Sequence, residues 1–412
     1  MTNPFYDPYR VLLKIYGEGA HLKIALAETP IEELHRARTV KTVYGVLERD
    51  AYFSRCIAAF AEKNPKQSVR VLLKISLYWL TVLKKPKYMV TDTAVELLKK
   101  LGKGGMAGFV NAFLRKFEEG EVRLPKGDEG LAVKYNYPLF AVRKIRAQYG
   151  DRAERILAAR SAGVTVRFVR GAERYADKPH TQTPFEGVQI FENFTRDDGF
   201  FAGDYTFQSV GSVAIASAVE PCLKLLDACA APGGKSVLLA EKCGSVTACE
   251  LHAHRVELIR QYCARMNAKN VVPMQADSSV YRPEFSEAYD GVLCDVPCSG
   301  LGTLAENPDI ALRTPDFQSL NEAQSAILNN CARYVKAGGC LYYSTCSLLQ
   351  EENDEIVGAF LREHAEFQAE EIRSPLDALK TQFGLQFLPD TAFGAGFYVC
   401  KMRKVVGNGA NV

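Results

Sequence analysis

The spacing of hydrophobic residues divides the chain into a helical front and a back built from short apolar runs. Through the first 120 residues the apolar positions recur three or four apart, the spacing of one helix face. The almost uninterrupted apolar stretch Val69–Leu83 predicts the central buried helix. Residues 1–122 show no group of side chains suited to catalysis, so we expect an all-helical domain used for binding or structure. The stretch Ile31–Leu47 predicts a further helix, with an inner face formed by Leu34, Val40, Val43 and Val46.

The composition changes between residues 118 and 130, where Glu, Gly, Pro and Lys predominate and indicate a linker. Residues 126–200 combine a basic helix with a strand at 165–170 and predict a small α+β connector. From residue 200 short apolar runs alternate with helical stretches, which predicts a parallel sheet covered by helices. Ligand sites in such sheets lie at the carboxyl ends of the strands. The strands are expected at 223–227, 245–249, 271–274, 289–294 and 339–344.

Composition excludes several classes of protein. The length of 412 residues predicts two or three domains. Hydrophobic residues make up 47% of the chain and charged residues 24%, values typical of a globular protein. No apolar run approaches the roughly 18–20 residues that cross a bilayer, and the first residues lack the segments of an export signal. The 12 cysteines have no Cys-x-x-Cys spacing. We therefore expect a cytoplasmic protein with reduced cysteines and no membrane association. We also expect no metal and a monomer, although the sequence does not determine the oligomeric state.

The net charge of +3 hides an uneven distribution. Residues 1–180 carry 33 Lys and Arg against 19 Asp and Glu, whereas residues 181–412 carry 18 against 29. A basic front joined to an acidic back indicates that the front binds a polyanion through its phosphates, with an ordinary solvated surface as the alternative. The connector side chains that could contact phosphates are Arg143, Lys144, Arg146, Arg167 and Arg170.

A glycine turn follows the first strand of the back part. Pro232-Gly233-Gly234 forces a tight turn between that strand and a helix, and such a turn directs free peptide N–H groups at a nucleotide-like ligand. Glu250 ends the next strand, where a carboxylate can accept both ribose hydroxyls of a nucleoside. Asp277 follows the third strand and could accept from an adenine amino group. The set fits a dinucleotide or S-adenosylmethionine, and the lack of a full G-x-G-x-x-G pattern disfavours the dinucleotide.

Two cysteines follow the fourth and fifth strands, Cys298 after Asp295-Val296-Pro297 and Cys346 after Thr345. Neighbouring strands lie about 4.8 Å apart, so we expect the two thiols to face one pocket, with buried structural thiols as the alternative. C5 of cytosine is not nucleophilic until something adds at C6, and a thiolate can make that addition. One thiol suffices for the addition, and a second group must help to remove the C5 proton and release the enzyme. We also expect Lys235 to contact Asp295.

Together these segments closely resemble the RNA (cytosine-5)-methyltransferases that use S-adenosylmethionine. The helical front, with Asn111–Arg115, resembles a NusB-type RNA-binding domain, and this pairing points to the RsmB (Sun/Fmu) type, which modifies small-subunit ribosomal RNA. The sequence departs from the usual pattern at Ser209 and Ala395, where acidic residues are common. The matching runs are Asp227–Lys235, Asp295–Gly300, Thr345–Ser347 with Glu351–Asn353, and the closing strand Gly396–Lys404.

The resemblance implies an α/β fold: a Rossmann-like S-adenosylmethionine-dependent methyltransferase sheet preceded by an all-α NusB-like bundle and a small α+β connector. The implied domains are 1–122 (NusB-like, RNA-binding), 126–200 (connector with RNA contact) and 201–405 (methyltransferase). The implied activity is methyl transfer to C5 of a cytosine in 16S ribosomal RNA through a covalent adduct between a cysteine and C6.

The resemblance also implies roles for single residues. Cys346 would be the nucleophile, Cys298 would assist proton removal or product release, and Asp295 would contact the base edge or the cofactor. Lys235 is the fourth member of the implied catalytic group. The residues implied to hold S-adenosylmethionine are Cys229, Ala230, Ala231, Pro232, Gly233, Gly234, Lys235, Glu250, Asp277 and Asp295.

Several alternatives stay open. Pro-Cys is the nucleophile motif of DNA cytosine-5 methyltransferases, which leaves Cys298 as an alternative nucleophile. A non-catalytic RNA-binding factor in ribosome assembly would keep the fold without turnover, and a nicotinamide dehydrogenase would bind NAD instead. The sequence leaves open which cytosine is modified and whether transfer RNA is also a substrate.

Overall fold

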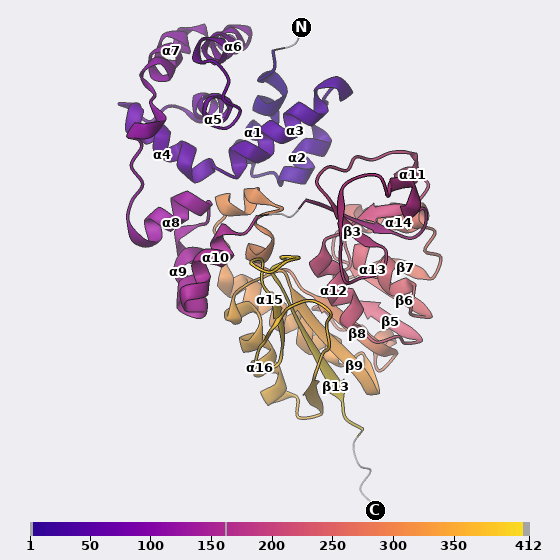
Figure 1. Cartoon of the computed structure of the whole chain (residues 1–412). Helices are drawn as coiled ribbons and strands as arrows, with labels where there is room; N and C mark the ends of the chain where they lie inside the picture. The colour runs from indigo at the N-terminus through magenta and orange to yellow at the C-terminus, as the bar shows by residue number, and fades with distance from the viewer. Residues whose placement is uncertain (1–2, 161–162, 407–412) are drawn as a thin grey trace, which may run out of the picture. The chain divides into compact units, whose positions relative to one another are not determined.

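Helices alone build the front of the chain in the computed structural model, which describes residues 3–160 and 163–406 (Figure 1). The chain divides into two units: residues 1–157 with 304–314 form the first, and residues 158–303 with 315–412 form the second. The helices of the first unit are α1 (Tyr6–Glu18), α2 (Leu22–Glu28), α3 (Glu33–Leu47), α4 (Asp50–Phe60), α5 (Gln67–Thr81), α6 (Lys87–Lys100), α7 (Ala107–Lys116), α8 (Gly127–Tyr135), α9 (Leu139–Tyr149) and α10 (Ala153–Ala158).

The central helix of the first unit is α5, as its apolar sequence predicts. Its apolar side chains are almost wholly shielded from solvent because helices α1, α3, α4 and α6 pack around it. Burial on every face of a helix requires apolar residues on every face, which the sequence of α5 supplies. The most buried of these side chains are Val71, Leu72, Leu73, Ile75 and Leu77.

Helix α3 corrects one detail of the predicted inner face. Val43 and Val46 are fully buried and Val40 is half-buried, but Leu34 is 88% exposed. At 3.6 residues per turn, a residue nine positions before Val43 lies on the opposite side of the helix. The buried face also includes Thr39. A polar residue therefore belongs to the buried face of α3, and Leu34, which was predicted to belong to it, does not.

A small antiparallel sheet opens the second unit, with strand order β2-β3-β1-β4. Arg167, on β1, was predicted as a phosphate contact, and the structure shows that prediction to be wrong. Its side chain is only 4% exposed, and it binds Glu241 at 2.6 Å and Gln208 at 2.9 Å, because it lies on the inward face of the strand. The elements of this region are β1 (Val164–Phe168), β2 (His180–Gln182), β3 (Val188–Phe191), α11 (Asp198–Phe201) and β4 (Tyr205–Phe207).

The large sheet of the second unit has nine strands in the order β11-β12-β13-β9-β8-β5-β6-β7, with β10 beside β13 (Figure 1). Strands β7, β6, β5, β8 and β9 are parallel, and β13 runs antiparallel to β9. The strands are β5 (Lys224–Asp227), β6 (Ser245–Glu250), β7 (Val271–Gln275), β8 (Tyr289–Asp295), β9 (Val335–Thr345), β10 (Phe367–Glu370), β11 (Leu379–Lys380), β12 (Gly384–Phe387) and β13 (Phe397–Lys404). The five predicted parallel strands are confirmed.

Alternating side chains of the parallel strands build two cores, one on each face of the sheet. Leu225 packs with residues of helices α12, α13 and α14, whereas Leu226 packs with residues of α15 and α16. Two covered faces require strands that are apolar on both sides, which is typical of parallel sheets. The helices are α12 (Val210–Ala218), α13 (Gly234–Ala240), α14 (Ala253–Met266), α15 (Phe317–Ala332) and α16 (Asp354–Glu363). Across the described parts of the chain, no helix has the length and apolar character needed to cross a membrane.

Candidate active site at the carboxyl ends of the parallel strands

The glycine turn joins the end of β5 to the start of α13. Gly233 directly precedes the helix with a φ of 105°, a conformation that L side chains rarely adopt. The turn is tied to the next strand, since the N–H of Ala230 donates to the carbonyl of Cys249 at 2.8 Å. It is closed by a bond from the N–H of Gly233 to the carbonyl of Ala230 at 2.7 Å. The backbone from Cys229 to Lys235 is therefore held at the end of the sheet.

A buried carboxylate lies at the start of this turn. Asp227 is 1% exposed, and its Oδ2 accepts from Ser236 Oγ at 2.7 Å. Its Oδ1 receives no hydrogen bond from any residue that the structure describes. Burial raises the pKa of Asp227 to about 6, because the charged form loses its hydration. The sequence places Asp227 in the turn motif but gives it no role of its own.

Glu250 and Asp277 follow the next two strands along the same edge. Glu250 is buried, and its carboxylate accepts from the N–H of His252 at 3.0 Å and pairs with Arg255 at 3.2 Å. Asp277, two residues beyond β7, is exposed and accepts from the N–H and the hydroxyl of Ser279 at 2.9 and 2.6 Å. Because β5, β6 and β7 are adjacent and parallel, the structure brings the predicted carboxylates to one edge of the sheet.

The predicted contact between Lys235 and Asp295 is confirmed. Lys235 Nζ donates to Asp295 Oδ2 at 2.7 Å, and Ser344 Oγ donates to Asp295 Oδ1 at 2.7 Å. Burial lowers the pKa of Lys235, but the charge and hydrogen bond of Asp295 outweigh that effect and leave the pKa above its ordinary value. The ammonium group therefore stays charged at neutral pH and fixes the carboxylate at the ends of β8 and β9.

The two predicted cysteines lie side by side. Strands β8 and β9 are adjacent, with Asp295 opposite Ser344, and the chain reaches Cys298 and Cys346 just beyond them. Their Sγ atoms are 3.1 Å apart, and the N–H of Cys346 donates to Cys298 Sγ at 3.3 Å. The hydrogen bond with Cys346 and burial raise the pKa of the Cys298 thiol well above its ordinary value. Cys298 therefore retains its proton at neutral pH and can donate it to the neighbouring sulfur.

Sequence reasoning did not predict the polar contacts that hold these cysteines. Glu352 is fully buried and bonded to Ser299 and Ser347, the residues that follow Cys298 and Cys346. The sequence analysis includes Glu352 in the matching run Glu351–Asn353 but gives it no role, because the surrounding charged residues predict a solvated surface.

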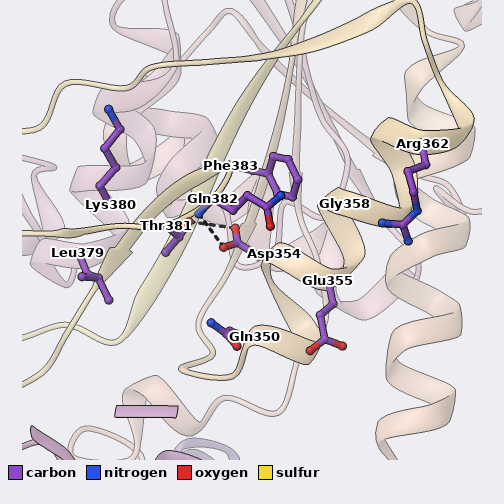
Figure 2. A pocket seen from close by; sticks show the side chains of 10 residues that line it. All are labelled: Gln350, Asp354, Glu355, Gly358, Arg362, Leu379, Lys380, Thr381, Gln382 and Phe383. Atoms are coloured by element: carbon purple, nitrogen blue, oxygen red, sulfur yellow. Dashed lines mark hydrogen bonds between the residues drawn. The ribbon is translucent and has the colours of Figure 1, made fainter. Parts of the chain in front are cut away.

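A separate polar pocket of about 590 Å³ lies between α16 and the β11–β12 hairpin (Figure 2). Asp354 accepts there from Thr381 Oγ1 at 2.9 Å and from the N–H of Gln382 at 3.1 Å. Glu355 and Arg362 also line the pocket (Figure 2). It contains none of the residues predicted for the site.

Known proteins resemble this chain in both of its parts. Residues 216–403 match the family model described as 16S rRNA methyltransferase RsmB/F, and residues 10–119 match the NusB family. The chain is 31% identical to the probable ribosomal RNA small subunit methyltransferase B of Bacillus subtilis (strain 168), over 93% of this chain and 94% of that one. It is 30% identical to ribosomal RNA small subunit methyltransferase B of Xylella fastidiosa (strain 9a5c), over 96% of this chain and 99% of that one.

Solved structures share the fold. The crystal structure of PH0851 has a TM-score of 0.83 at 21% identity and covers 97% of this chain and 98% of its own. The structure of NSun6 from Pyrococcus horikoshii with SFG has a TM-score of 0.60 at 18% identity and covers 66% of this chain and 99% of its own. The solved structures show the fold alone. The relatives of 30% and 31% identity show the family, because their alignments cover the helical front as well as the sheet. The chain belongs to the RsmB/F family of 16S rRNA methyltransferases.

Proposed function

We propose that the chain methylates C5 of a cytosine in 16S ribosomal RNA through a covalent bond between Cys346 Sγ and C6 of the base. The observation that carries the proposal is the 3.1 Å contact between the sulfur atoms of Cys298 and Cys346, beside the pair formed by Lys235 and Asp295. Methyl transfer to C5 through a C6 adduct needs one group to attack and another to assist release, and two adjacent thiols meet both needs.

The residues at the ends of β5, β6 and β7 fit S-adenosylmethionine. Asp227 Oδ1 is a buried acceptor that lacks a donor among the described residues, and the Glu250 carboxylate is suited to ribose hydroxyls. Asp277 is an exposed acceptor at the same edge. Carboxylates also favour a cationic sulfonium centre by charge. When bound, S-adenosylmethionine supplies an electrophilic methyl group.

The chain's own residues then have distinct tasks. Cys346 Sγ forms a bond to C6, and the electron pair of the C5–C6 double bond moves to C5. C5 thereby becomes nucleophilic, which it is not in the free base. Asp295 is held by Lys235 and Ser344, and its proposed task is to contact the base edge. After methylation, Cys298 gives its proton to the Cys346 sulfur as the S–C6 bond breaks, and the Cys298 thiolate so formed accepts the C5 proton. The electron pair of the C5–H bond then restores the C5–C6 double bond, and Cys346 is free. A Cys298 that keeps its proton is suited to be this donor.

A trapping experiment tests the nucleophile. In Cys298→Ala the attack by Cys346 proceeds and release fails, so we expect a covalent protein–RNA adduct that survives denaturing electrophoresis. Cys346→Ala should form none. An adduct with Cys346→Ala and none with Cys298→Ala would assign the attack to Cys298 instead.

A mapping experiment tests the substrate. The basic front and the connector are proposed to hold RNA phosphates, and the target base has to be single-stranded or flipped out to reach Cys346.

We further propose that the protein acts as a cytoplasmic monomer on 16S ribosomal RNA. Bisulfite sequencing of ribosomal RNA from cells with and without the protein should reveal one cytosine that loses its methyl group. In an assay with S-adenosylmethionine that carries a labelled methyl group, RNA binding without transfer of the label would favour a non-catalytic assembly factor. Label in transfer RNA would show that transfer RNA is also a substrate.

A further inference from the structure

One carboxylate is bonded to both cysteine-bearing turns. Glu352 has no exposed surface, and its Oε1 accepts from the N–H of Ser299 at 2.7 Å and from Gln324 Nε2 at 3.2 Å. Its Oε2 accepts from the hydroxyls of Ser299 and Ser347. Ser299 directly follows Cys298 and Ser347 directly follows Cys346. Glu352 therefore joins the two turns, and it does so beside the direct contact of 3.4 Å between the hydroxyls of Ser299 and Ser347.

The neighbouring Asn353 fixes the Cys346 turn independently. Its Oδ1 accepts from Thr345 Oγ1 at 2.6 Å, and its Nδ2 donates to the carbonyl of Ser347 at 3.2 Å. The N–H of Ser347 also donates to Thr345 Oγ1 at 3.2 Å. The residues on both sides of Cys346 are thus anchored. Glu352 adds a buried charged link from this turn to Ser299, beside the direct bond from the N–H of Cys346 to Cys298 Sγ.

We propose that Glu352 is a positioning residue that couples the two turns and keeps the sulfur atoms of Cys298 and Cys346 in contact. This inference rests on the proposed function and adds to it a residue that touches none of the reacting atoms. A buried carboxylate with four donors is held in one geometry, since each charge-assisted bond is directional and costly to break. A fixed sulfur spacing lets attack and release act on the same ring.

The carboxylate also acts on Cys298 through its charge. The pKa of Cys298 is raised by its hydrogen bond with Cys346, by burial and by the negative charges of Cys346 and Glu352, and it is lowered by a bond from the backbone of Gly300. Tyr343 interacts with this thiol electrostatically, and the N–H of Cys346 donates to its sulfur at 3.3 Å. Removal of the charge at position 352 therefore lowers the pKa of Cys298.

Glu352→Gln tests the proposal because it keeps the shape of the side chain and removes its charge. Glu355→Gln is the matched control, since Glu355 is exposed on α16 at the separate polar pocket (Figure 2). Each variant is compared with the wild type in methyl transfer, in S-adenosylmethionine binding by calorimetry, and in alkylation of Cys298 by iodoacetamide at a series of pH values. For Glu352→Gln we expect kcat to fall roughly 10- to 100-fold at unchanged KM. We also expect the alkylation profile of Cys298 to move to lower pH, and no change for Glu355→Gln.

A double-mutant cycle separates coupling from general loss of structure. Ser347→Ala should lower kcat when it is introduced into the wild-type protein. It should have little further effect in the Glu352→Gln variant, because the bond between Ser347 and residue 352 is already weakened there. Additive effects, or a wild-type kcat and alkylation profile in Glu352→Gln, would overturn the proposal. If Glu352→Gln does not fold, Ser299→Ala and Ser347→Ala decide by the same kcat and alkylation measurements. If the wild type transfers no methyl group, the proposed function fails, whereas the alkylation profiles still decide on the positioning role.

Discussion

Replacing Asp227 by Asn should change how the stability of the protein depends on pH. Burial raises the pKa of Asp227 from 3.8 to about 6. Below pH 4 the carboxyl is protonated in the folded and the unfolded chain, so its burial does not make the free energy of unfolding depend on pH. Between pH 4 and 6 the unfolded chain ionises while the folded protein keeps the proton, and the free energy of unfolding falls as pH rises. A shift of about two pKa units corresponds to a total loss of about 3 kcal/mol.

The amide of the Asp227→Asn variant cannot ionise, so the variant lacks this loss. Its free energy of unfolding relative to the wild type should rise by about 2 kcal/mol between pH 4.5 and 7.5, the part of the total that falls in this range. A constant offset from the buried amide does not affect this difference. Urea denaturation of the cofactor-free protein, followed by circular dichroism across this pH range, measures it.

Asp290→Asn is a control with the opposite sign. Burial raises the pKa of Asp290, but Lys336 at 2.6 Å and the N–H of Lys224 at 2.8 Å outweigh it, so the pKa is lowered. That carboxylate stabilises the fold above its unfolded pKa, and the stability is lost as pH falls through its folded pKa. The relative stability of Asp290→Asn should therefore fall as pH rises. A pH-independent difference for Asp227→Asn would refute the argument that its carboxylate is buried without adequate donors.

Three further substitutions test packing and backbone geometry. Lys74→Met removes the ion-pair partner of Asp50 inside the first unit and should lower the free energy of unfolding by roughly 3–5 kcal/mol in denaturant titrations. The double variant that also carries Asp50→Asn should recover part of this loss, because it leaves no unpaired carboxylate. Gly45→Ala places a methyl group against the ring of Tyr78 and should cost roughly 1–3 kcal/mol in the same assay. Gly233→Ala strains a positive-φ position by roughly 1–3 kcal/mol and should weaken S-adenosylmethionine binding in calorimetry.

Much of the site edge was predictable because strand ends are fixed by local pattern. Apolar runs bounded by Gly, Pro and Asp set the parallel strands, and in a parallel sheet every carboxyl end lies at the same edge. The sequence therefore placed Glu250, Asp295, Cys298 and Cys346 together without any knowledge of their side-chain geometry. The contact of Lys235 with Asp295 was predictable for the same reason, because the helix after β5 begins beside the end of β8.

The burial and the role of the supporting groups were not predictable, because both depend on tertiary partners. Glu352 stands among Gln350, Glu351 and Asp354, and only the arrival of Ser299 and Gln324 from distant segments makes it a buried acceptor. Strands β10, β11 and β12 were missed because they are short and lie toward the edge of the sheet, where local alternation is weak.

The corrected role of Arg167 leads to a prediction that separates RNA contact from structure. Arg143 lies exposed on α9, whereas Arg167 is buried against Glu241 and Gln208. If Arg143 neutralises one RNA phosphate, Arg143→Gln should weaken RNA binding and reduce the slope of log K against log salt concentration by about 0.7–0.9. Arg167→Gln should leave that slope unchanged and lower the free energy of unfolding by roughly 1–3 kcal/mol, because a buried charge-assisted bond is lost. Fluorescence anisotropy with a labelled 16S fragment at several salt concentrations measures the slope. An unchanged slope for Arg143→Gln would remove α9 from the RNA-binding surface, and a reduced slope for Arg167→Gln would contradict its structural assignment.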